Sequence, residues 1–158
     1  MNKNEKGIKP AKTNISFNVV IESIDKLTRK VIKRETIHNT ITNVGLERIA
    51  KLLGKLSSTG FDYIALGTDA TASQATDVEL GAEVERELAG ISYVASYKCQ
   101  FLKVFSVGSG VSHSVKEVGI FDSVTPLGSV MWARVNCNNT LDADTDLSVT
   151  MTYTFAQA

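Results

Sequence analysis

Residues 147–155 read Leu147-Ser148-Val149-Thr150-Met151-Thr152-Tyr153-Thr154-Phe155, an alternation of apolar and hydroxyl side chains. Successive side chains of a β-strand point to opposite faces of the sheet, so this segment has one apolar face and one polar face. Such a segment is typical of an antiparallel sheet with one buried side and one side in water. Other long segments of the chain repeat the pattern, and the sequence therefore predicts a mainly β fold.

About seven segments predict strands, and the turn signals between them favour an antiparallel β-sandwich of jelly-roll-like type. The predicted strands are residues 15–24, 30–38, 61–66, 91–107, 115–122, 128–136 and 147–155. Residues 25–28 supply a hairpin turn between the first two strands. Residues 67–77 form a long turn-rich loop, a type of segment that is often engaged with a partner. Residues 78–87 are expected to form one or two acidic helical turns.

One amphipathic helix is predicted after the second strand. Asn43 can cap its start, and apolar residues then recur at three- and four-residue spacing. These residues are Leu46, Ile49, Ala50, Leu53 and Leu56. Gly54 weakens the end of this segment and marks the stop of the helix. We expect the helix to lie across a sheet face or to close one end of the sandwich.

The 158 residues suffice for one domain with a buried core, and 43 % apolar and 22 % charged residues are close to the globular average. We expect residues 15–158 to form this domain and residues 1–14 to form an extended N-terminal arm, polar and rich in lysine. The start of the chain lacks the apolar segment of a signal peptide, and no apolar run is long enough to span a bilayer. A protein made in the cytoplasm, with no membrane partner, is expected.

The net charge is zero, but the charges are unevenly distributed. Residues 1–55 carry twelve Lys/Arg and five Asp/Glu, whereas residues 56–158 carry five and twelve, so the two parts have net charges of +7 and −7. Complementary patches of this kind can join copies of a chain, or a chain and its neighbour. The alternative is that both are solvated surface. The candidate partner-binding residues are Lys3, Lys6, Lys9, Lys12, Lys33 and Arg34 in the basic part, and Thr68, Asp69, Thr71, Asp77, Glu79 and Glu83 in the loop and acidic part.

Nucleic acid is a disfavoured partner. The lysines of the arm could contact phosphates, but no aromatic residues are interleaved with them to stack on bases. The positive arm therefore predicts a protein partner.

No catalytic or metal-binding constellation is visible in the sequence. His38 and His113 have no second ligand or acid at a metal-binding spacing. Residues 142–146 contain three alternating aspartates but lack the glycine and the distal glutamate of a calcium loop, which favours an acidic turn. The nucleophile elbow, the Walker loop and the dinucleotide fingerprint are missing as well. We therefore predict a protein that is not an enzyme and binds no cofactor or metal.

Four single residues complete the list of expectations. Cys99 and Cys137 make no disulfide framework, and Cys99 lies on the apolar side of its predicted strand, as a small buried residue would. Trp132 and Arg134 share one face by strand parity. We expect Trp132 in the core with Arg134 at its rim. The alternative is that both belong to an exposed contact, because Trp and Arg are favoured interface anchors.

Several segments, in order, resemble small structural proteins of tailed bacteriophages. The matching segments are residues 39–46, 63–68, 76–83, 115–122, 131–134 and 147–150. The first is similar to the family's "N-x-I-x-N-x-G-L" lead into a helix. The second and third resemble its "y-I-A-L-G-T-G-x-T…D-T-x-L-x-x-E" stretch, the fourth its "i-x-E-x-G-l-F" strand, and the last two its closing strands. The order of the motifs carries the resemblance, since none of them is diagnostic alone.

The resemblance covers residues 38–155, departs from the pattern at Asp69, where the family often has glycine, and does not include residues 1–37. Members of the family are capsid decoration proteins, head fibres, and tail-fibre or collar components, so the resemblance implies a building block of the virion. The expected function is that of a capsid decoration or cement protein docked on the capsid lattice. Its expected partners are other virion proteins, such as the major capsid protein or a tail or collar protein, and copies of itself.

Two alternatives remain open at this stage. One is a tail, collar or fibre-attachment subunit. The other is a carbohydrate-binding β-sandwich module, in which Tyr93 and Tyr97 could stack on sugars. We disfavour the second alternative because the same side of that predicted strand also carries Cys99 and Phe101, which indicates core.

Overall fold

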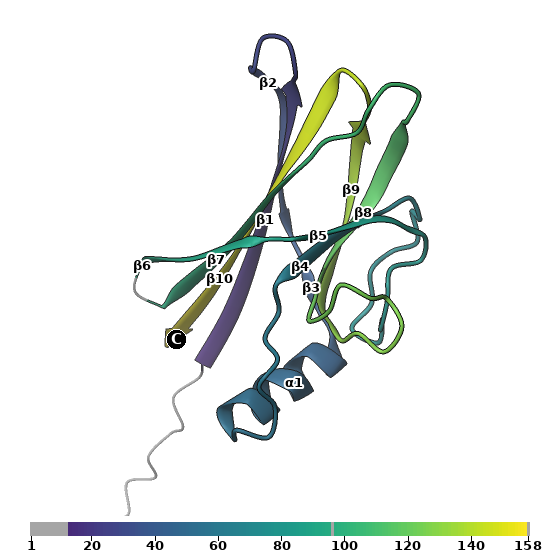
Figure 1. Ribbon diagram of the computed structural model, residues 1–158. Coiled ribbons are helices and arrows are strands. Elements are labelled where there is room, and N and C mark those ends of the chain that lie inside the picture. The colour runs from purple at the N-terminus through teal and green to yellow at the C-terminus, as the bar shows by residue number, and fades with distance from the viewer. Residues whose placement is uncertain (1–12, 96, 158) are drawn as a thin grey trace, which may run out of the picture.

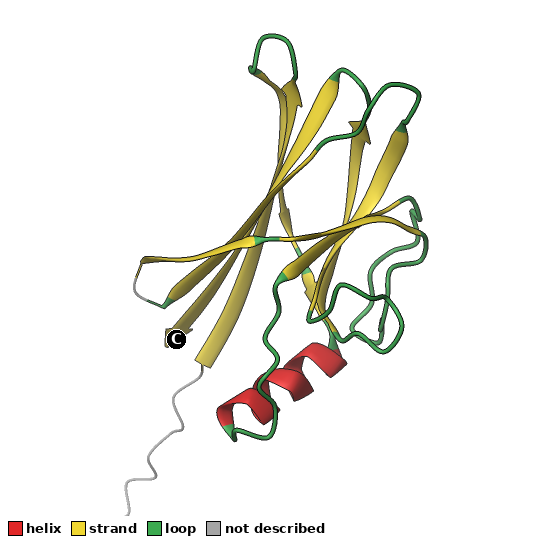
Figure 2. Cartoon of the chain, in the orientation of Figure 1, coloured by secondary structure: helices red, strands yellow, loops and turns green. Residues whose placement is uncertain are grey.

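The computed structural model describes residues 13–95 and 97–157, and in it the alternating segment 147–155 belongs to the central strand of a five-stranded sheet (Figure 1). This sheet, sheet A, has the order β2-β1-β10-β7-β6, and a second sheet, sheet B, has the order β3-β9-β8-β4-β5. The elements are β1 Thr13–Asp25, β2 Val31–His38, β3 Thr40–Ile41, α1 Asn43–Leu53, β4 Tyr63–Gly67, β5 Glu83–Leu88, β6 Gly90–Ala95, β7 Lys98–Phe105, β8 His113–Phe121, β9 Met131–Leu141 and β10 Thr145–Gln157. All strand pairings are antiparallel. The predicted mainly β sandwich with one helix is confirmed (Figure 2).

The alternation in β10 has the expected consequence. Leu147, Val149, Met151 and Tyr153 are fully buried between the two sheets. Only Phe155, at the end of the row, is 37 % exposed, because the strand there extends beyond the part of the sandwich that sheet B covers. β10 pairs with β1 over its whole length and with β7 on the other side, so it anchors sheet A.

Five aromatic side chains join the sheets at one end of the core. Trp132 of β9 stacks on Tyr153 of β10, with ring centroids 3.4 Å apart, and on Phe61, 4.9 Å away. Phe17 and Phe101 of sheet A pack around the same pair. Aromatic contacts of this type add stabilisation beyond the area they bury. The expectation that Trp132 lies in the core is met.

Arg134 does not lie at the rim of that core, and the parity argument that placed it beside Trp132 is wrong. The pairing of β8 with β9 has an irregularity in which Ile120 faces Ala133 and Phe121 faces Met131, so Trp132 is an extra residue. An extra residue of this type shifts the alternation of side chains along the strand. Trp132 therefore enters the core, whereas Arg134 points to the opposite face of sheet B and is buried there.

Two sequence expectations about the segment 78–107 are wrong. Residues 83–88 are strand β5 and not acidic helical turns, since Glu83, Glu85 and Glu87 recur with the two-residue period of a strand. The single strand predicted at residues 91–107 is two antiparallel strands, β6 and β7. Tyr97 adopts a left-handed backbone conformation, φ +64°, between them. With ten strands among the described residues, the sandwich has more strands than the seven expected.

The helix forms where it was predicted, but its buried face is different. Thr42, and not Asn43, is the N-cap, and its hydroxyl accepts a hydrogen bond from the Gly45 N–H at 3.1 Å. Gly45 is buried directly against Trp132, and this contact orients the helix. As a result Leu53 is 83 % exposed instead of facing the core. Leu46 and Leu56 are exposed too, and Gly54 ends the helix as expected.

The remaining local expectations have mixed outcomes. The hairpin of β1 and β2 is confirmed. Residues 1–12 of the predicted arm lie outside the described residues, and Thr13 and Asn14 already belong to β1. Cys99 is half-buried, and burial raises the pKa of Cys137 to about 12, so this thiol stays protonated at neutral pH. Tyr93 and Tyr97, which the strand pattern placed on the core side, are exposed.

Gly45→Ala tests the contact that orients the helix. A Cβ at this position would lie 2.6 Å from the Trp132 Cα and from the Trp132 carbonyl oxygen, and backbone atoms cannot move aside. We expect a loss of about 1–3 kcal/mol in the free energy of unfolding, the usual cost of overpacking a core, measured by urea denaturation. Gly60→Ala is the control, because its Cβ would meet nothing within 4 Å. Equal stability of the two variants would contradict the packing described above.

Candidate functional site

A long loop covers the face of sheet B that points away from sheet A. This β4–β5 loop, residues 68–82, joins β4 to β5 and contains five of the candidate residues selected from the sequence. Its Leu80 packs with Ala65, Phe121 and Met131 in a small second core on that face. The loop is therefore part of the folded domain, and the interest lies in what fixes its conformation.

Glu117 of β8 lies beneath the loop and is 0 % exposed. Its carboxylate accepts hydrogen bonds from the backbone N–H groups of Gly81, at 3.1 Å, and Ala82, at 2.9 Å. The Asp69 N–H, at 3.4 Å, makes a longer contact with the same carboxylate. Gly67 lies against this carboxylate so closely that any Cβ there would overlap it. A carboxylate that receives backbone donors holds both ends of the loop to one point of the sheet.

Arg134 of β9, 4 % exposed, completes the buried network. Its Nε lies 2.8 Å from the Glu117 carboxylate. One terminal nitrogen donates to the Asp77 carboxylate at 2.8 Å, and the other donates to the Thr71 carbonyl at 2.9 Å. A buried ion pair is tolerated when its polar atoms find partners, and here the two terminal nitrogens of Arg134 are hydrogen-bonded, while its Nε has the Glu117 carboxylate at ion-pair distance but no well-aligned hydrogen bond. Glu117 and Arg134 therefore hold the start, middle and end of the loop.

Further hydrogen bonds tie the middle of the loop to neighbouring elements. The Ser73 N–H donates to the Asn136 side chain at 2.7 Å, and the Ser73 hydroxyl lies 2.9 Å from that of Thr40 in β3. The Asn43 N–H at the start of α1 donates to the Ala75 carbonyl at 2.8 Å. The loop thus contacts sheet B along its length, while residues 70–72, 74–76 and 78–79 expose their side chains.

Most of the acidic candidates have partners inside the same chain. Asp69 accepts from the backbone and the hydroxyl of Thr71, and these hydrogen bonds lower the pKa of Asp69. Asp77 is paired with Arg134. Glu83 binds Arg86 through both carboxylate oxygens, at 2.8 and 2.6 Å. Glu79 and the small residues of the loop are left to face a partner, so the acidic surface is weaker than the charge count indicates.

The basic candidates are on a different part of the molecule. Lys33 and Arg34 are exposed on β2 of sheet A, where Lys33 lies 3.6 Å from Glu35 and Arg34 lies 3.5 Å from Glu22. Ion pairs at such exposed positions contribute little to stability. Lys33 also donates to the Asn138 carbonyl in β9, so Arg34 is the more available of the two to a partner. The other basic candidates, Lys3, Lys6, Lys9 and Lys12, lie outside the described residues. The structure does not bring the described basic and acidic candidates together within one copy.

Sequence reasoning missed Glu117 and misplaced Arg134. The available signal was weak: Glu117 is a charged residue in a segment otherwise predicted as a half-buried strand, followed two positions later by Gly119. A Cβ at Gly119 would lie 2.9 Å from the Phe121 ring and 3.0 Å from Leu80. An acidic residue and a glycine at this spacing on a strand face indicate a loop packed closely on that face.

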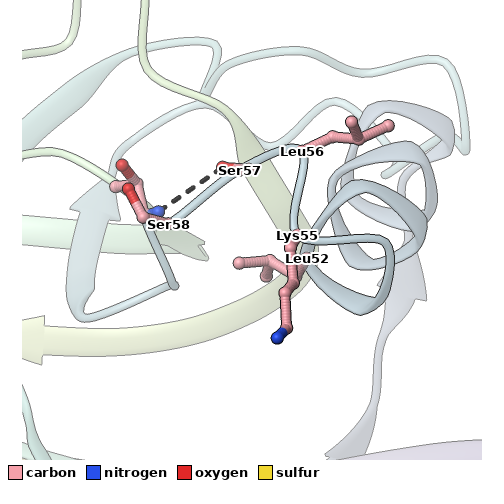
Figure 3. Close-up of a pocket in the computed structure, with 6 residues that line it drawn as sticks. Leu52, Lys55, Leu56, Ser57 and Ser58 are labelled. Carbon is pink, nitrogen blue, oxygen red and sulfur yellow. Dashed lines mark hydrogen bonds between the residues drawn. The ribbon is translucent and has the colours of Figure 1, made fainter.

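A surface hollow at the end of α1 is lined by Leu52, Lys55, Leu56 and residues 57–59, and Figure 3 shows that the labelled side chains diverge instead of converging on one point. Within residues 13–95 and 97–157, no group of three or more His, Cys, Asp or Glu could hold a metal ion. No helix in this part of the chain has the length and apolarity needed to cross a membrane.

Comparison of the chain with protein-family models, with curated proteins and with solved structures gives no match.

Glu117→Ala tests the network that holds the loop. The substitution removes one of the two carboxylates that lie 2.8 Å from the buried Arg134 guanidinium and leaves Asp77 as its counter-charge, and we expect a loss of about 3 kcal/mol in unfolding free energy. The Gly81 and Ala82 amides should also lose protection in hydrogen exchange, because their acceptor is removed. Glu79→Ala, an exposed acidic residue of the same loop, is the control and should change stability by less than ~0.5 kcal/mol. Unchanged exchange at both amides would show that Glu117 does not fix the loop.

Proposed function

We propose that the protein is a non-enzymatic structural subunit of a tailed-bacteriophage particle, and specifically a capsid decoration or cement protein that docks on the capsid lattice. One observation carries the proposal: the β4–β5 loop is fixed from below by a buried ion pair that bonds to the loop at several points inside the domain. What this arrangement presents to the outside is a preformed surface of small and hydroxyl side chains. A preformed surface loses little conformational entropy when it binds, which suits docking.

The positions of the motif residues support the proposal. The resemblance to phage structural proteins is carried by separate segments, and residues from several of them meet at this loop. Gly67 contacts Glu117, and Glu117 contacts Arg134. Gly45 packs on Trp132, which is two residues from Arg134 in the same strand. The shared pattern is therefore explained by the construction of a loop-bearing sandwich, without any need for catalytic groups.

The proposed partners are other virion proteins, the major capsid protein first among them, and further copies of the chain. The protein is made in the host cytoplasm and acts in the virion. Docking on a repeated lattice places many equal contacts side by side, so contacts that are weak singly hold the subunit through multivalency. In this proposal the arm, reduced to residues 1–12 because Thr13 and Asn14 belong to β1, lies on a neighbouring subunit, and the parts with net charges of +7 and −7 meet between copies.

Two other functions compete with this one. A tail, collar or fibre-attachment subunit would use the same surfaces at a different place on the particle. A carbohydrate-binding module is favoured by one finding, the exposure of Tyr93 and Tyr97, which leaves both rings open to stacking on a sugar. Specific binding on a glycan array would establish the carbohydrate function and replace the proposal.

Deletion of residues 1–12 tests the arm. We expect the truncated protein to be absent from particles assembled in its presence, because the arm supplies a contact with the neighbouring subunit. Its urea unfolding midpoint should stay close to that of the full chain, since the described domain begins at Thr13. The control substitutes Lys30 with Ala on the folded domain and should leave incorporation intact. Full incorporation of the truncated protein would exclude the arm contact.

Copy number in purified particles distinguishes the capsid from the tail. A decoration protein of the capsid lattice should be present in hundreds of copies, since every repeating unit of the lattice offers a site. A ring of tail or collar subunits has about a dozen or fewer. Quantitative mass spectrometry of virions against the major capsid protein gives the ratio directly. A count near twelve would support the tail or collar alternative. Absence of the protein from virions would contradict the proposed function.

A further inference from the structure

One of the four sheet edges, strand β6, carries no charged side chain, and its one irregularity is a bulge between Tyr93 and Ala95. Exposed edges are normally protected by charged side chains or by being very short. β2 carries Lys33, Arg34 and Glu35, and β3 has two residues only. β5 contains three glutamates and an arginine. β6, with the sequence Gly-Ile-Ser-Tyr-Val-Ala, has no charge and no proline.

β6 is also exposed along its whole length. It is the last strand of sheet A, and every one of its six residues is exposed. Tyr93, 74 % exposed, faces Cys99 in the pairing with β7, and Ile91 faces the buried Phe101. Directly paired residues share a face, so Ile91 and Tyr93 belong to the core side of the sheet. They are exposed because β6 projects beyond sheet B (Figure 1).

The outward face of this edge carries apolar side chains as well. Leu102 and Val104 of β7, whose neighbours Phe101 and Phe105 point into the core, are exposed on the outer side of sheet A. Of the two lysines of β7, Lys103 is engaged by Glu87 at 2.6 Å, whereas Lys98, which pairs with Ala95 of β6, is exposed at the hairpin end of the same face. The exposed apolar side chains at this edge are Ile91, Tyr93, Val94, Tyr97, Leu102 and Val104. Their exposed surface is on the order of 600 Å², an upper limit on what a contact at this edge can bury and below the ~800 Å² that one partner contributes to a standard interface, so a dimer of modest affinity is expected.

The N-terminal arm is a poor occupant for this edge. Strand β1 begins at the end of sheet A where β6 and β7 turn, so the arm could reach β6. However, residues 1–12 contain four lysines, a glutamate and Pro10, with Ile8 as their one β-branched residue. Pairing this segment with an uncharged edge would bring lysines onto an apolar surface, and Pro10 would interrupt the ladder.

We propose that β6 pairs with β6 of a second copy, antiparallel and across a two-fold axis, so that the two A sheets become continuous. The second copy supplies the partner strand that the edge lacks, because its own β6 has unpaired backbone donors and acceptors and apolar side chains on both faces. A two-fold axis makes the same patch complementary to itself, and the contact closes as a dimer without forming a filament. The proposal extends the proposed function and rests on it in one respect, the assembly role of the chain. The dimer contact leaves the β4–β5 loop uncovered.

The test measures the mass of the full chain in solution by sedimentation equilibrium between about 1 and 100 µM. The unmodified chain should be a dimer in the upper part of this range. Tyr93→Lys places an uncompensated charge in the centre of the contact and should raise the dimer dissociation constant at least ~30-fold, the effect of losing one hot-spot residue. Ile32→Lys is the matched control: Ile32 is an exposed apolar residue on the charged edge β2, and the dimer should persist.

Several outcomes would overturn the dimer. A monomer at 100 µM does so, as does equal weakening by Tyr93→Lys and Ile32→Lys. Dissociation of the dimer by deletion of residues 1–12 would assign the edge to the arm. Both variants should keep the unfolding midpoint of the parent chain, because both residues are largely exposed. The particle assay is independent of this measurement. A monomeric chain that still enters virions would contradict only the dimer. A dimeric chain that never enters virions would contradict only the proposed function.

Discussion

A carboxylate and a guanidinium lie buried side by side beneath the β4–β5 loop, and the surroundings must satisfy every polar atom of both. Glu117 and Arg134 are removed from water, so each remaining donor or acceptor needs a partner inside the protein. The loop backbone supplies N–H groups to one and a carbonyl to the other, and Asp77 supplies a second counter-charge. The route of the loop is thereby constrained at three points. Gly67 belongs to the same constraint, because a side chain there would occupy the space of the carboxylate.

The position of this network follows from the layers of the sandwich. One face of sheet B packs on sheet A through the aromatic cluster around Trp132. The other face would be exposed to water if the loop did not cover it, and Gly119, Phe121 and Met131 on that face are buried by this cover. Because of the irregular pairing at Trp132, two residues of β9 that are two positions apart lie on opposite faces of sheet B. The tryptophan lies in the main core, and the arginine lies under the loop. A regular strand would have placed both side chains on the same side.

The sequence predicted the features that depend on local periodicity. The alternation in residues 147–155 located the buried row of β10, and the hairpin of β1 and β2 followed from its turn. The failures occurred where a tertiary contact overrides the local pattern. Leu53 is exposed to solvent because the contact between Gly45 and Trp132 sets the orientation of the helix. The spacing of apolar residues in the sequence could not predict this contact. The turn at Tyr97 uses no glycine, asparagine or proline, so the break between β6 and β7 left no signal. The sequence did not identify Glu117 as the centre of the buried network, because its partners come from segments that are distant in the sequence.

The two surfaces described above differ in the physics that makes them available for binding. The loop is polar, fixed by interactions beneath it, and its shape is complete before a partner arrives. The β6 edge is apolar and carries backbone groups that water satisfies now and a strand would satisfy equally well. The chain from β5 to β6 crosses from sheet B to sheet A, so one continuous segment forms the edge of both sheets, charged in its first half and uncharged in its second. A protein that needed only solubility would gain from charges in both halves. Their restriction to β5 is the reason to regard β6 as a contact surface, and since β6 and the loop lie on different elements, a subunit can use both at once.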